Sequence, residues 1–459
     1  MEPNQQVDTI CAISTAPGVG GIAVARVSGP DAFEIVDKIW QGRRLAECES
    51  HTAHLGTVID TQGKPLDQAV ATIYRGPRSF TGDDTVEIAV HGSRWIQREL
   101  IDSLCRAGCR LAEAGEFTRR AFSSGKMDLA EAEAVADMIA STSRAAHRIA
   151  STQMRGHYSA HLGALRDKLI DLAALLELEL DFSEEEVEFA SREKLRTLAR
   201  ELHDEISRLT ASFRSGAAIK DGVPVAIIGP TNAGKSSLLN ALVGDDRAIV
   251  SSIHGTTRDI IEDTIEIGDY LFRFQDTAGL RTTDDTIERI GIDRSLTAAQ
   301  KAHIVILVID LSDTRESQTD DLAAPSIIYL NKTDLVDEGA TAEAVGRVHQ
   351  QYPRATVISG TTRSAETIGK LRDALTDIMD READSGAGDI LVTNARHVQA
   401  LTQALDSVSR VIQGLDANLS GDFIAQDIRE TIHHLAAITG DITTPDLLAT
   451  IFSRFCIGK

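Results

Sequence analysis

The sequence predicts a multidomain fold with three parts: an α+β amino-terminal domain, an all-α helical domain, and an α/β domain inserted into the helical part. Three observations predict it. Residues 1–125 hold short alternating strands, residues 126–220 and 381–459 have helical periodicity, and residues 221–380 alternate apolar strands with helices. A length of 459 residues accommodates about three domains.

Short strands separated by turns predict the amino-terminal domain. Thr9–Ala12 and Gly21–Val27 alternate like strands, and the glycine-rich turn Pro17–Gly21 joins them. Thr85–Val90 is a further strand. Taken alone, this glycine cluster indicates a turn and not a ligand site.

A capping box at Asp128–Glu131 predicts the start of the helical domain, because an apolar face with helical spacing follows it. The same periodicity predicts further helices on both sides of the insertion, over residues 159–180, 191–214, 398–415, 423–439 and 444–455. Ser385–Asp389 is rich in small residues and is the expected linker back into the helical domain. An insertion of this kind requires that the two ends of the inserted domain lie close together.

Composition and charge narrow the class of protein. Hydrophobic residues make up 42% and charged residues 25%, and there is no apolar run of 18 residues and no apolar targeting core, so we expect a cytoplasmic protein without a membrane span. The net charge of −22, from 47 basic and 69 acidic residues, argues against a broad basic face for nucleic acid. An RNA substrate would need a local patch or a partner protein. The five cysteines have no zinc spacing and are expected to be reduced: Cys11, Cys48, Cys105, Cys109 and Cys456.

The inserted domain opens with a phosphate-binding motif. Residues 229–236 read Gly-Pro-Thr-Asn-Ala-Gly-Lys-Ser and fit G-x-x-x-x-G-K-[ST], between an apolar strand at Val223–Ile228 and a helix that begins at Ser237. In such a loop the backbone N–H groups and the helix N-terminus face phosphate oxygens. Lys235 is expected to reach the terminal phosphates and Ser236 to bind Mg²⁺.

Further nucleotide motifs follow in order. Gly255–Asp259 offers a threonine for Mg²⁺ and the γ-phosphate, before a strand at 260–267. The next strand, 270–275, ends at Asp276-Thr277-Ala278-Gly279, where an Asp suits an outer-shell contact to Mg²⁺ and Gly279 can offer its N–H to the γ-phosphate.

Three more apolar stretches, residues 304–310, 326–330 and 355–359, are the expected remaining strands. The second delivers Asn331-Lys332-Thr333-Asp334, which resembles the guanine-reading N-K-x-D of GTPases, and Ser359-Gly360 stands where GTPases usually have Ser-Ala. Asp334 would accept hydrogen bonds from N1–H and the 2-amino group of guanine, so GTP is favoured over ATP. The motif order predicts a Ras-like P-loop GTPase; an ATPase with an accidental N-K-T-D is the alternative.

The group that orients the attacking water is not evident from the residues alone. Leu280 occupies the position of the Ras glutamine and cannot act as one. Asp284, Asp285 and Glu288 are the candidates, and each is equally consistent with a solvated helix face. Asn232 is a further clue, because in some GTPases an asparagine at this place helps hold K⁺ beside the phosphates.

Several separate segments together resemble the MnmE (TrmE) family of tRNA uridine-5-carboxymethylaminomethyl modification GTPases. The resemblance runs from Asp8 to Lys459 and is carried, outside the GTPase, by residues 8–10, 20–21, 26–29, 79–87, 91–92, 115–118, 120–122, 126–130 and 456–459. It implies the fold described above, with tetrahydrofolate binding and dimerisation assigned to the amino-terminal domain.

The resemblance also implies a reaction. Family members act with an FAD-dependent partner, an MnmG-like flavoprotein that uses FAD and NADH, on the wobble uridine of tRNA, and glycine or ammonium supplies the nitrogen. A tetrahydrofolate derivative, 5,10-methylene or 5-formyl, would supply the one-carbon unit. The matching folate-binding positions are Arg26, Glu87, Lys126 and Lys459. Cys456 is either a nucleophile or a small buried hydrophobe.

Within the GTPase, the resemblance assigns roles residue by residue. Glu288 matches the acidic residue that positions the hydrolytic water, with Arg281 as support and Lys235 on the phosphates. Mg²⁺ is assigned to Ser236 and Thr257, and K⁺ to Asn232, Ser251, Ile253 and Thr256. The implied nucleotide contacts are Asn232, Ala233, Gly234, Lys235, Ser236, Ser237, Ser251, Ile253, Thr256, Thr257, Asp276, Thr277, Ala278, Gly279, Asn331, Lys332, Asp334, Ser359 and Gly360.

Two rival functions fit the sequence less well than this one. A ribosome-assembly GTPase of the Era or Der kind would carry a basic RNA-binding domain after the GTPase, where this chain has an acidic helical region. A folate-binding regulator with decayed hydrolysis would be expected to have lost Lys235, Asp276 or Glu288, and all are present.

Overall fold

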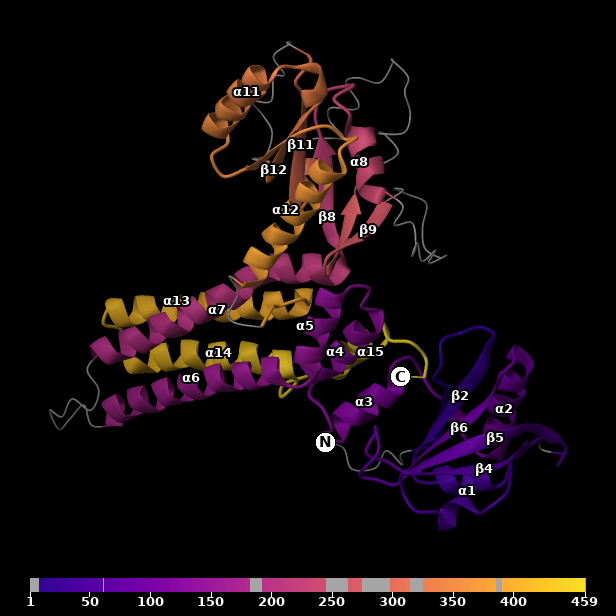
Figure 1. Ribbon diagram of the computed structural model, residues 1–459. Helices are drawn as coiled ribbons and strands as arrows, with labels where there is room; N and C mark the ends of the chain where they lie inside the picture. Colours follow the sequence, from indigo (N-terminus) through magenta and orange to yellow (C-terminus); the bar gives the residue numbers. More distant parts are fainter. Residues whose placement is uncertain are drawn as a thin grey trace. The chain divides into compact units, whose positions relative to one another are not determined.

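The computed structural model describes residues 8–60, 62–181, 192–244, 263–274, 298–313, 325–384 and 390–458 (Figure 1). They form two compact units. The first consists of the described residues within 1–136, 154–163 and 435–459, and the second of those within 137–153 and 164–434.

The first unit is built on one seven-stranded sheet in the order β3-β4-β5-β6-β2-β1-β7. Its strands are β1 (Ile10–Ile13), β2 (Gly20–Ser28), β3 (Trp40–Gln41), β4 (Thr52–Ile59), β5 (Pro65–Tyr74), β6 (Thr85–Gly92) and β7 (Arg110–Leu111). Neighbouring strands are antiparallel, except that β7 pairs with β1 in parallel. The expected strands at 9–12, 21–27 and 85–90 are therefore present, each shifted or extended by one or two residues.

Alternation along the strands decides which face is covered. Val86, Ile88 and Val90 of β6 point into a core with α1 (Ala32–Asp37) and α2 (Arg94–Ala107). On the opposite face, α3 (Glu116–Ser123) packs Phe117 against Ile10 at the β1 end of the sheet.

The helical segments are largely where periodicity predicts them. Their bounds are α4 (Leu129–Ala140), α5 (Arg144–Met154), α6 (His157–Asp181), α7 (Arg192–Asp221), α13 (Ala395–Asp416), α14 (Gly421–Thr439) and α15 (Pro445–Phe452), with a short 3₁₀ turn η1 (Leu45–Glu47) in the first unit. α7 runs to Asp221 and not to 214, because Ala217 to Ile219 continue a helix-compatible pattern. α7 and α13 pack along one another (Figure 1), with Arg196 bonded to the Leu415 carbonyl at 2.8 Å.

The second unit contains a six-stranded sheet in the order β13-β12-β11-β8-β10-β9. Its strands are β8 (Val223–Ile228), β9 (Asp263–Ile267), β10 (Tyr270–Phe274), β11 (Ile304–Asp310), β12 (Ile327–Asn331) and β13 (Thr356–Ser359). Only the β9–β10 pair is antiparallel. α8 (Lys235–Val243) and α12 (Ala365–Asp384) cover one face, and α11 (Glu338–Gln351) covers the other. The carboxyl ends of the parallel strands meet at one edge, where ligands bind in open α/β sheets.

Candidate functional site

The phosphate loop connects β8 to α8, as predicted. Its backbone enters the left-handed region at Asn232, with φ of 64°, and at Gly234, with φ of 97°. A Cβ on Gly234 would lie 2.2 Å from Nδ2 of Asn331, so no other residue fits there. Because Gly234 is the N-cap of α8, the first free N–H groups of that helix border the loop.

Lys235 is held by its own loop. Its Nζ donates to the carbonyl of Gly229 at 2.8 Å and to that of Pro230 at 2.7 Å. Burial lowers the pKa of Lys235. Phosphate oxygens would offer this ammonium stronger, charged acceptors than two carbonyls, so the residues present fit a nucleotide phosphate.

The guanine-reading loop is joined to the phosphate loop by a buried side chain. Asn331 ends β12, is 2% exposed, and donates from Nδ2 to the Ala233 carbonyl at 2.8 Å. Among the described residues, its buried Oδ1 has no hydrogen-bond partner. Asp334 is exposed within the 3₁₀ turn η2 (Thr333–Leu335), and Gly360 donates to the Leu330 carbonyl at 3.0 Å, so residues from β12 and β13 meet at this edge.

Asp310 also belongs to this site, although no sequence motif assigns it a role. Its Oδ2 lies 2.5 Å from Nζ of Lys332. Burial disfavours the charged form of Asp310, but hydrogen bonds from Lys332 and Ser312 outweigh burial and lower the pKa. Its position could have indicated this role, because Asp310 ends the strand predicted at residues 304–310, and polar residues at the carboxyl ends of parallel strands gather at the ligand site.

Several predicted site residues lie outside the described residues, and their roles stay predictions: Ser251, Ile253, Thr256, Thr257, Asp276, Thr277, Ala278, Gly279, Arg281, Glu288 and Lys459. Leu280, Asp284 and Asp285 lie there as well. Of the described phosphate-loop residues, Asn232 and Ser237 are exposed and Ser236 is half-buried. Ser359 is exposed at the end of β13.

In the first unit, two of the predicted folate residues form one ion pair. Arg26 on β2 and Glu87 on β6 are register partners, and Nε and Nη2 of Arg26 lie 3.0 and 2.8 Å from Oε1 of Glu87. The guanidinium lies 5.2 Å from the ring centre of Phe80 and 5.5 Å from that of Phe117. Burial and then the Glu87 carboxylate raise the pKa of Tyr74, which therefore borders the pair.

Lys126 is tied to the loop that carries Phe80. Its Nζ donates to the Pro77 carbonyl at 2.6 Å, and its side chain lies near Gly82 of the same loop. Ser124 donates to the Thr81 carbonyl at 2.5 Å. The loop between β5 and β6 thus connects Lys126 with the surroundings of Arg26.

The carboxyl-terminal residues are seated on the amino-terminal sheet of their own chain. Ile457 forms a bridge with Ala114, and the carbonyl of Cys456 accepts from the N–H of Gly115 at 3.4 Å. A Cβ on Gly458, whose φ is 100°, would lie 2.1 Å from the Ile13 carbonyl oxygen. The Cys456 side chain is exposed, so the alternative reading as a buried small hydrophobe was wrong.

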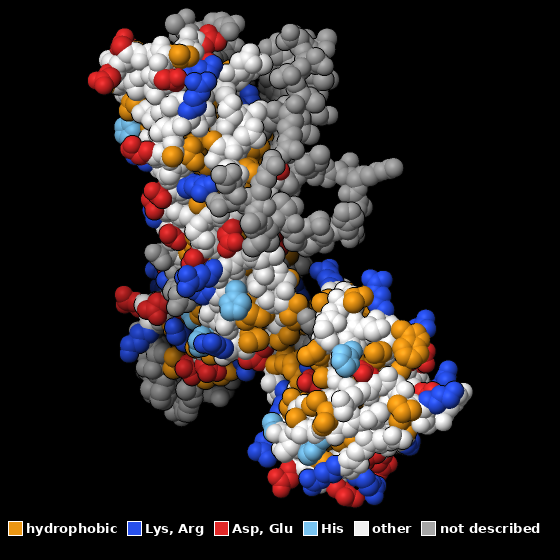
Figure 2. Space-filling view, turned by 45° about the vertical axis from the view of Figure 1, so that its right-hand side comes forward, with side chains coloured by type: hydrophobic (Ala, Val, Ile, Leu, Met, Phe, Trp, Pro, Cys, Tyr) orange, Lys and Arg blue, Asp and Glu red, His pale blue; other side chains and the backbone are white. Residues whose placement is uncertain are grey.

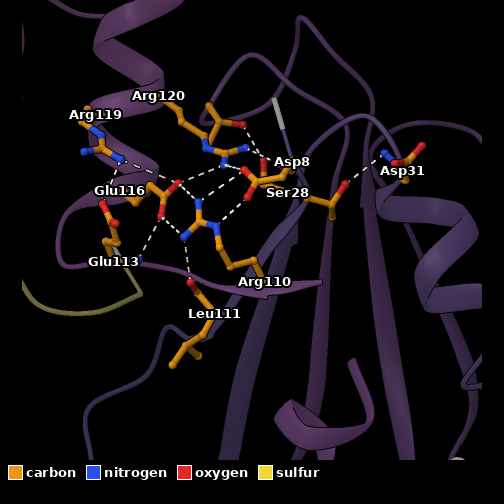
Figure 3. A network of polar contacts seen from close by, with 11 residues as sticks. Asp8, Ser28, Asp31, Arg110, Leu111, Glu113, Glu116, Arg119 and Arg120 are labelled. Carbon is orange, nitrogen blue, oxygen red and sulfur yellow. Dashed lines mark hydrogen bonds and ion pairs between the residues drawn. The ribbon is translucent and has the colours of Figure 1, made fainter. Parts of the chain in front are cut away.

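A polar network connects three of the segments on which the family resemblance depends, residues 8–10, 115–118 and 120–122 (Figure 3). Glu116 is 2% exposed and accepts from Nη2 of Arg110 at 2.6 Å and of Arg120 at 2.9 Å. Both guanidiniums also reach Asp8, with Nε of Arg110 at 2.5 Å and Nη2 of Arg120 at 2.8 Å. The backbone N–H of Glu113 adds a bond of 2.9 Å to Glu116. These residues join β7 and α3 to the start of β1, which is a structural role.

The charges of this network are stable at neutral pH. Burial raises the pKa of Glu116, but the bonds from Arg110, Glu113 and Arg120 outweigh it, and the net shift is downward. The hydrogen bond from Arg110 is the largest cause of the lowered pKa of Asp8. Both carboxylates are therefore ionised when the unit is folded.

The sheet order, the phosphate loop and the N-K-x-D loop define a P-loop GTPase. Residues 9–126 match the family model of the GTP-binding protein TrmE N-terminus, and residues 129–456 match that of the MnmE helical domain. A tRNA modification GTPase MnmE of Parabacteroides distasonis is 50% identical over 466 residues, covering 99% of this chain and 100% of that protein. One of Bacteroides thetaiotaomicron is 47% identical over 470 residues, covering 98% and 99%.

The G domain of the T. maritima FeoB iron transporter is 23% identical and covers 34% of this chain and 97% of its own, with a TM-score of 0.25. The family assignment depends instead on the sequence matches. This chain belongs to the MnmE family and is a GTPase of tRNA modification. That membership sets aside the ribosome-assembly alternative. Within the described part of the chain, no helix is both long and apolar enough to cross a membrane.

Proposed function

We propose that this protein is a K⁺-stimulated GTPase that acts with an MnmG-like, FAD-dependent partner. Together they install the (carboxymethyl)aminomethyl group at C5 of the wobble uridine of tRNA, uridine 34. A bound tetrahydrofolate derivative would supply the one-carbon unit, and NADH on the partner the reducing equivalents. Membership in the family supports the reaction class.

The phosphate and guanine loops carry the GTPase half of the proposal. Lys235 would exchange its two loop carbonyls for phosphate oxygens, and Asp334 would accept from the guanine edge. Mg²⁺, held by Ser236 and Thr257, and K⁺, held at Asn232, Ser251, Ile253 and Thr256, would supply positive charge beside the phosphates. Glu288, with support from Arg281, is the proposed group that positions the water.

The position of the carboxyl-terminal residues against the sheet of the first unit is the single observation that supports the proposed folate binding. A folate site shared by Arg26, Glu87, Lys126 and Lys459 needs both ends of the chain on one domain. The contacts of Ile457 with Ala114 and of Gly458 with Ile13 meet that requirement. In this site Glu87 would bind the pterin edge, with Arg26 beside it because the two side chains are paired at 2.8 Å, and Lys126 would bind a carboxylate of the folate tail.

Cys456 is the proposed nucleophile of the modification step. Its thiol is exposed, while the backbone beside it is fixed on Gly115. A thiol in this position is accessible to a substrate and held in place. Replacement by Ser should remove modification without changing GTP hydrolysis.

The proposal includes a homodimer through the amino-terminal domain. On the sheet face opposite α1 and α2, Leu55 is 67% exposed, and its cross-strand neighbour Val70 is 37% exposed. Figure 2 shows hydrophobic side chains gathered on the unit that contains this sheet. Val70→Asp should give monomers in sedimentation, whereas Phe423→Asp, at a 69% exposed position of α14, should not.

Mass spectrometry of wobble nucleosides from a deletion strain tests the whole proposal. Complementation with the native chain should restore the modified uridine, and Arg26→Ala should not. Arg44→Ala is the matched control, because Arg44 makes an exposed pair with Glu47 at 3.4 Å on the same unit. Normal modification without Arg26 and without folate binding would refute the folate half. Normal modification by Lys235→Ala, which should not hydrolyse GTP, would refute the requirement for hydrolysis.

The proposed domain division follows from the same reasoning. Residues 1–125 form the folate-binding and dimerisation domain, 126–220 and 381–459 the helical domain, and 221–380 the GTPase. The two compact units of the structure do not follow these limits, because residues 435–459 group with the amino-terminal sheet.

A further inference from the structure

The carboxylate of Asp310 is fixed on both of its oxygens. Asp310 ends β11 in register with Asn331, the last residue of the neighbouring strand β12. Ser312 donates its backbone N–H at 2.9 Å and its hydroxyl at 2.6 Å to Oδ1. Oδ2 accepts from Nζ of Lys332 at 2.5 Å. The turn after β11 therefore orients this carboxylate toward Lys332.

Lys332 needs such support. Its φ of 61° lies in the left-handed region, which is strained for a residue with a long side chain. The lysine side chain is 32% exposed and that of Asp310 only 11%. A charged pair that is shielded in this way is screened less than an exposed pair.

The same loop carries a second carboxylate. Asp334 lies two residues after Lys332, in the same loop, and is exposed. No ion pair to Asp334 is made by any residue that the structure describes. Because opposite charges in one short loop attract, an ammonium released from Asp310 would compete with guanine for Asp334.

We propose that Asp310 is a positioning residue for guanine recognition. By holding the Lys332 ammonium, it keeps the Asp334 carboxylate available for N1–H and the 2-amino group of the base. Hypoxanthine has the N1–H but lacks the 2-amino group. The contact of Asp334 with the base therefore contributes more binding free energy for GDP than for IDP. By protecting that contact, Asp310 increases the preference for GDP over IDP.

Calorimetric titration of the full chain with GDP and with IDP, in Mg²⁺, tests the proposal. Asp310→Asn should lower the affinity for GDP about tenfold, as expected for loss of a charge-assisted hydrogen bond. The affinity for IDP should fall less, so the GDP-to-IDP ratio falls. The rate of GTP hydrolysis at saturating GTP should not change, while KM rises.

Three further variants distinguish positioning from general damage. In a Lys332→Met background no ammonium remains to compete, so adding Asp310→Asn should leave the ratio unchanged. Ser312→Ala removes one bond to Oδ1 and should shift the ratio in the same direction by less; it also serves if Asp310→Asn fails to fold. Glu366→Gln, which breaks an exposed pair with Lys370 at 2.8 Å, is the control and should change neither affinity. Equal losses for GDP and IDP, or an effect that persists in the Lys332→Met background, would overturn the proposal.

Discussion

Replacement of Glu116 by Ala should destabilise the first unit more than any exposed charge change. Glu116 is 2% exposed and joins Arg110 and Arg120. Without it, two guanidiniums at this site share Asp8, whose side chain is 49% exposed. Removing one partner of a fully buried ion pair costs about 3–5 kcal/mol, but Arg110 is 42% exposed and Asp8 still pairs with both guanidiniums, so the loss here should be about 2–3 kcal/mol.

Tryptophan fluorescence during urea unfolding measures this effect selectively. The chain has two tryptophans, Trp40 and Trp95, and both lie in the first unit. With a typical urea dependence of about 1–3 kcal/mol per molar, the midpoint should fall by roughly 1–3 M. Glu116→Gln, which keeps the shape and loses only the charge, should fall by less.

The pH dependence gives an independent check. The pKa of Glu116 is lowered on folding, so its contribution to stability is present above the unfolded pKa and is lost as pH falls through the folded value. As the pH falls below the ordinary glutamate pKa of about 4.3, the native unit should therefore lose stability more steeply than the Glu116→Gln variant. The control is Glu47→Ala, at a position 63% exposed. If Glu116→Ala shifts the midpoint no more than Glu47→Ala, the network does not stabilise the unit and the reasoning is refuted.

Three other predictions concern the two sites. Replacing K⁺ by Na⁺ should slow GTP hydrolysis at least tenfold, about 1.4 kcal/mol of barrier, and equal rates would contradict the cation site at Asn232. Gly458→Ala would place a Cβ 2.1 Å from the Ile13 carbonyl oxygen, so the carboxyl-terminal residues should shift. Binding of 5-formyltetrahydrofolate, measured by calorimetry, should then weaken. An unchanged affinity would show that these residues do not contribute to the folate site. Gly360→Ala would meet Thr367 at 2.4 Å, so it should weaken GDP binding, and adding Thr367→Ala should restore part of the affinity. No recovery in the double variant would show that the contact with Thr367 is not the cause.

Local chemistry made the nucleotide site predictable from the sequence. The phosphate loop is a strand, a turn and a helix in direct succession, and its bounds at β8 and α8 agree with the pattern to within two residues. Asn331 and Asp334 follow one apolar strand in the same way. Each of these residues is placed by its immediate neighbours in the chain.

Partnerships across strands could not be predicted in this way. Arg26 and Glu87 are 61 residues apart, and only the register of β2 with β6 brings them together. The role of Glu116 depends on Arg110 and on Asp8, which come from two other strands or their ends. The sequence segments that contain these residues indicated the family, but not that several of them stabilise the domain.

The helix that enters the GTPase has the dimensions of a lever. α7 has 30 residues, or about 45 Å, and only Gly222 separates it from β8, which carries the phosphate loop at its other end. Gly222 has a φ of 88°, which residues other than glycine rarely adopt, and its carbonyl accepts from Nε of Arg273 at 3.1 Å. A turn of about 5° there would sweep the distant end of the rod through roughly 4 Å. A change too small to alter the nucleotide pocket visibly could thus be magnified along the helical bundle.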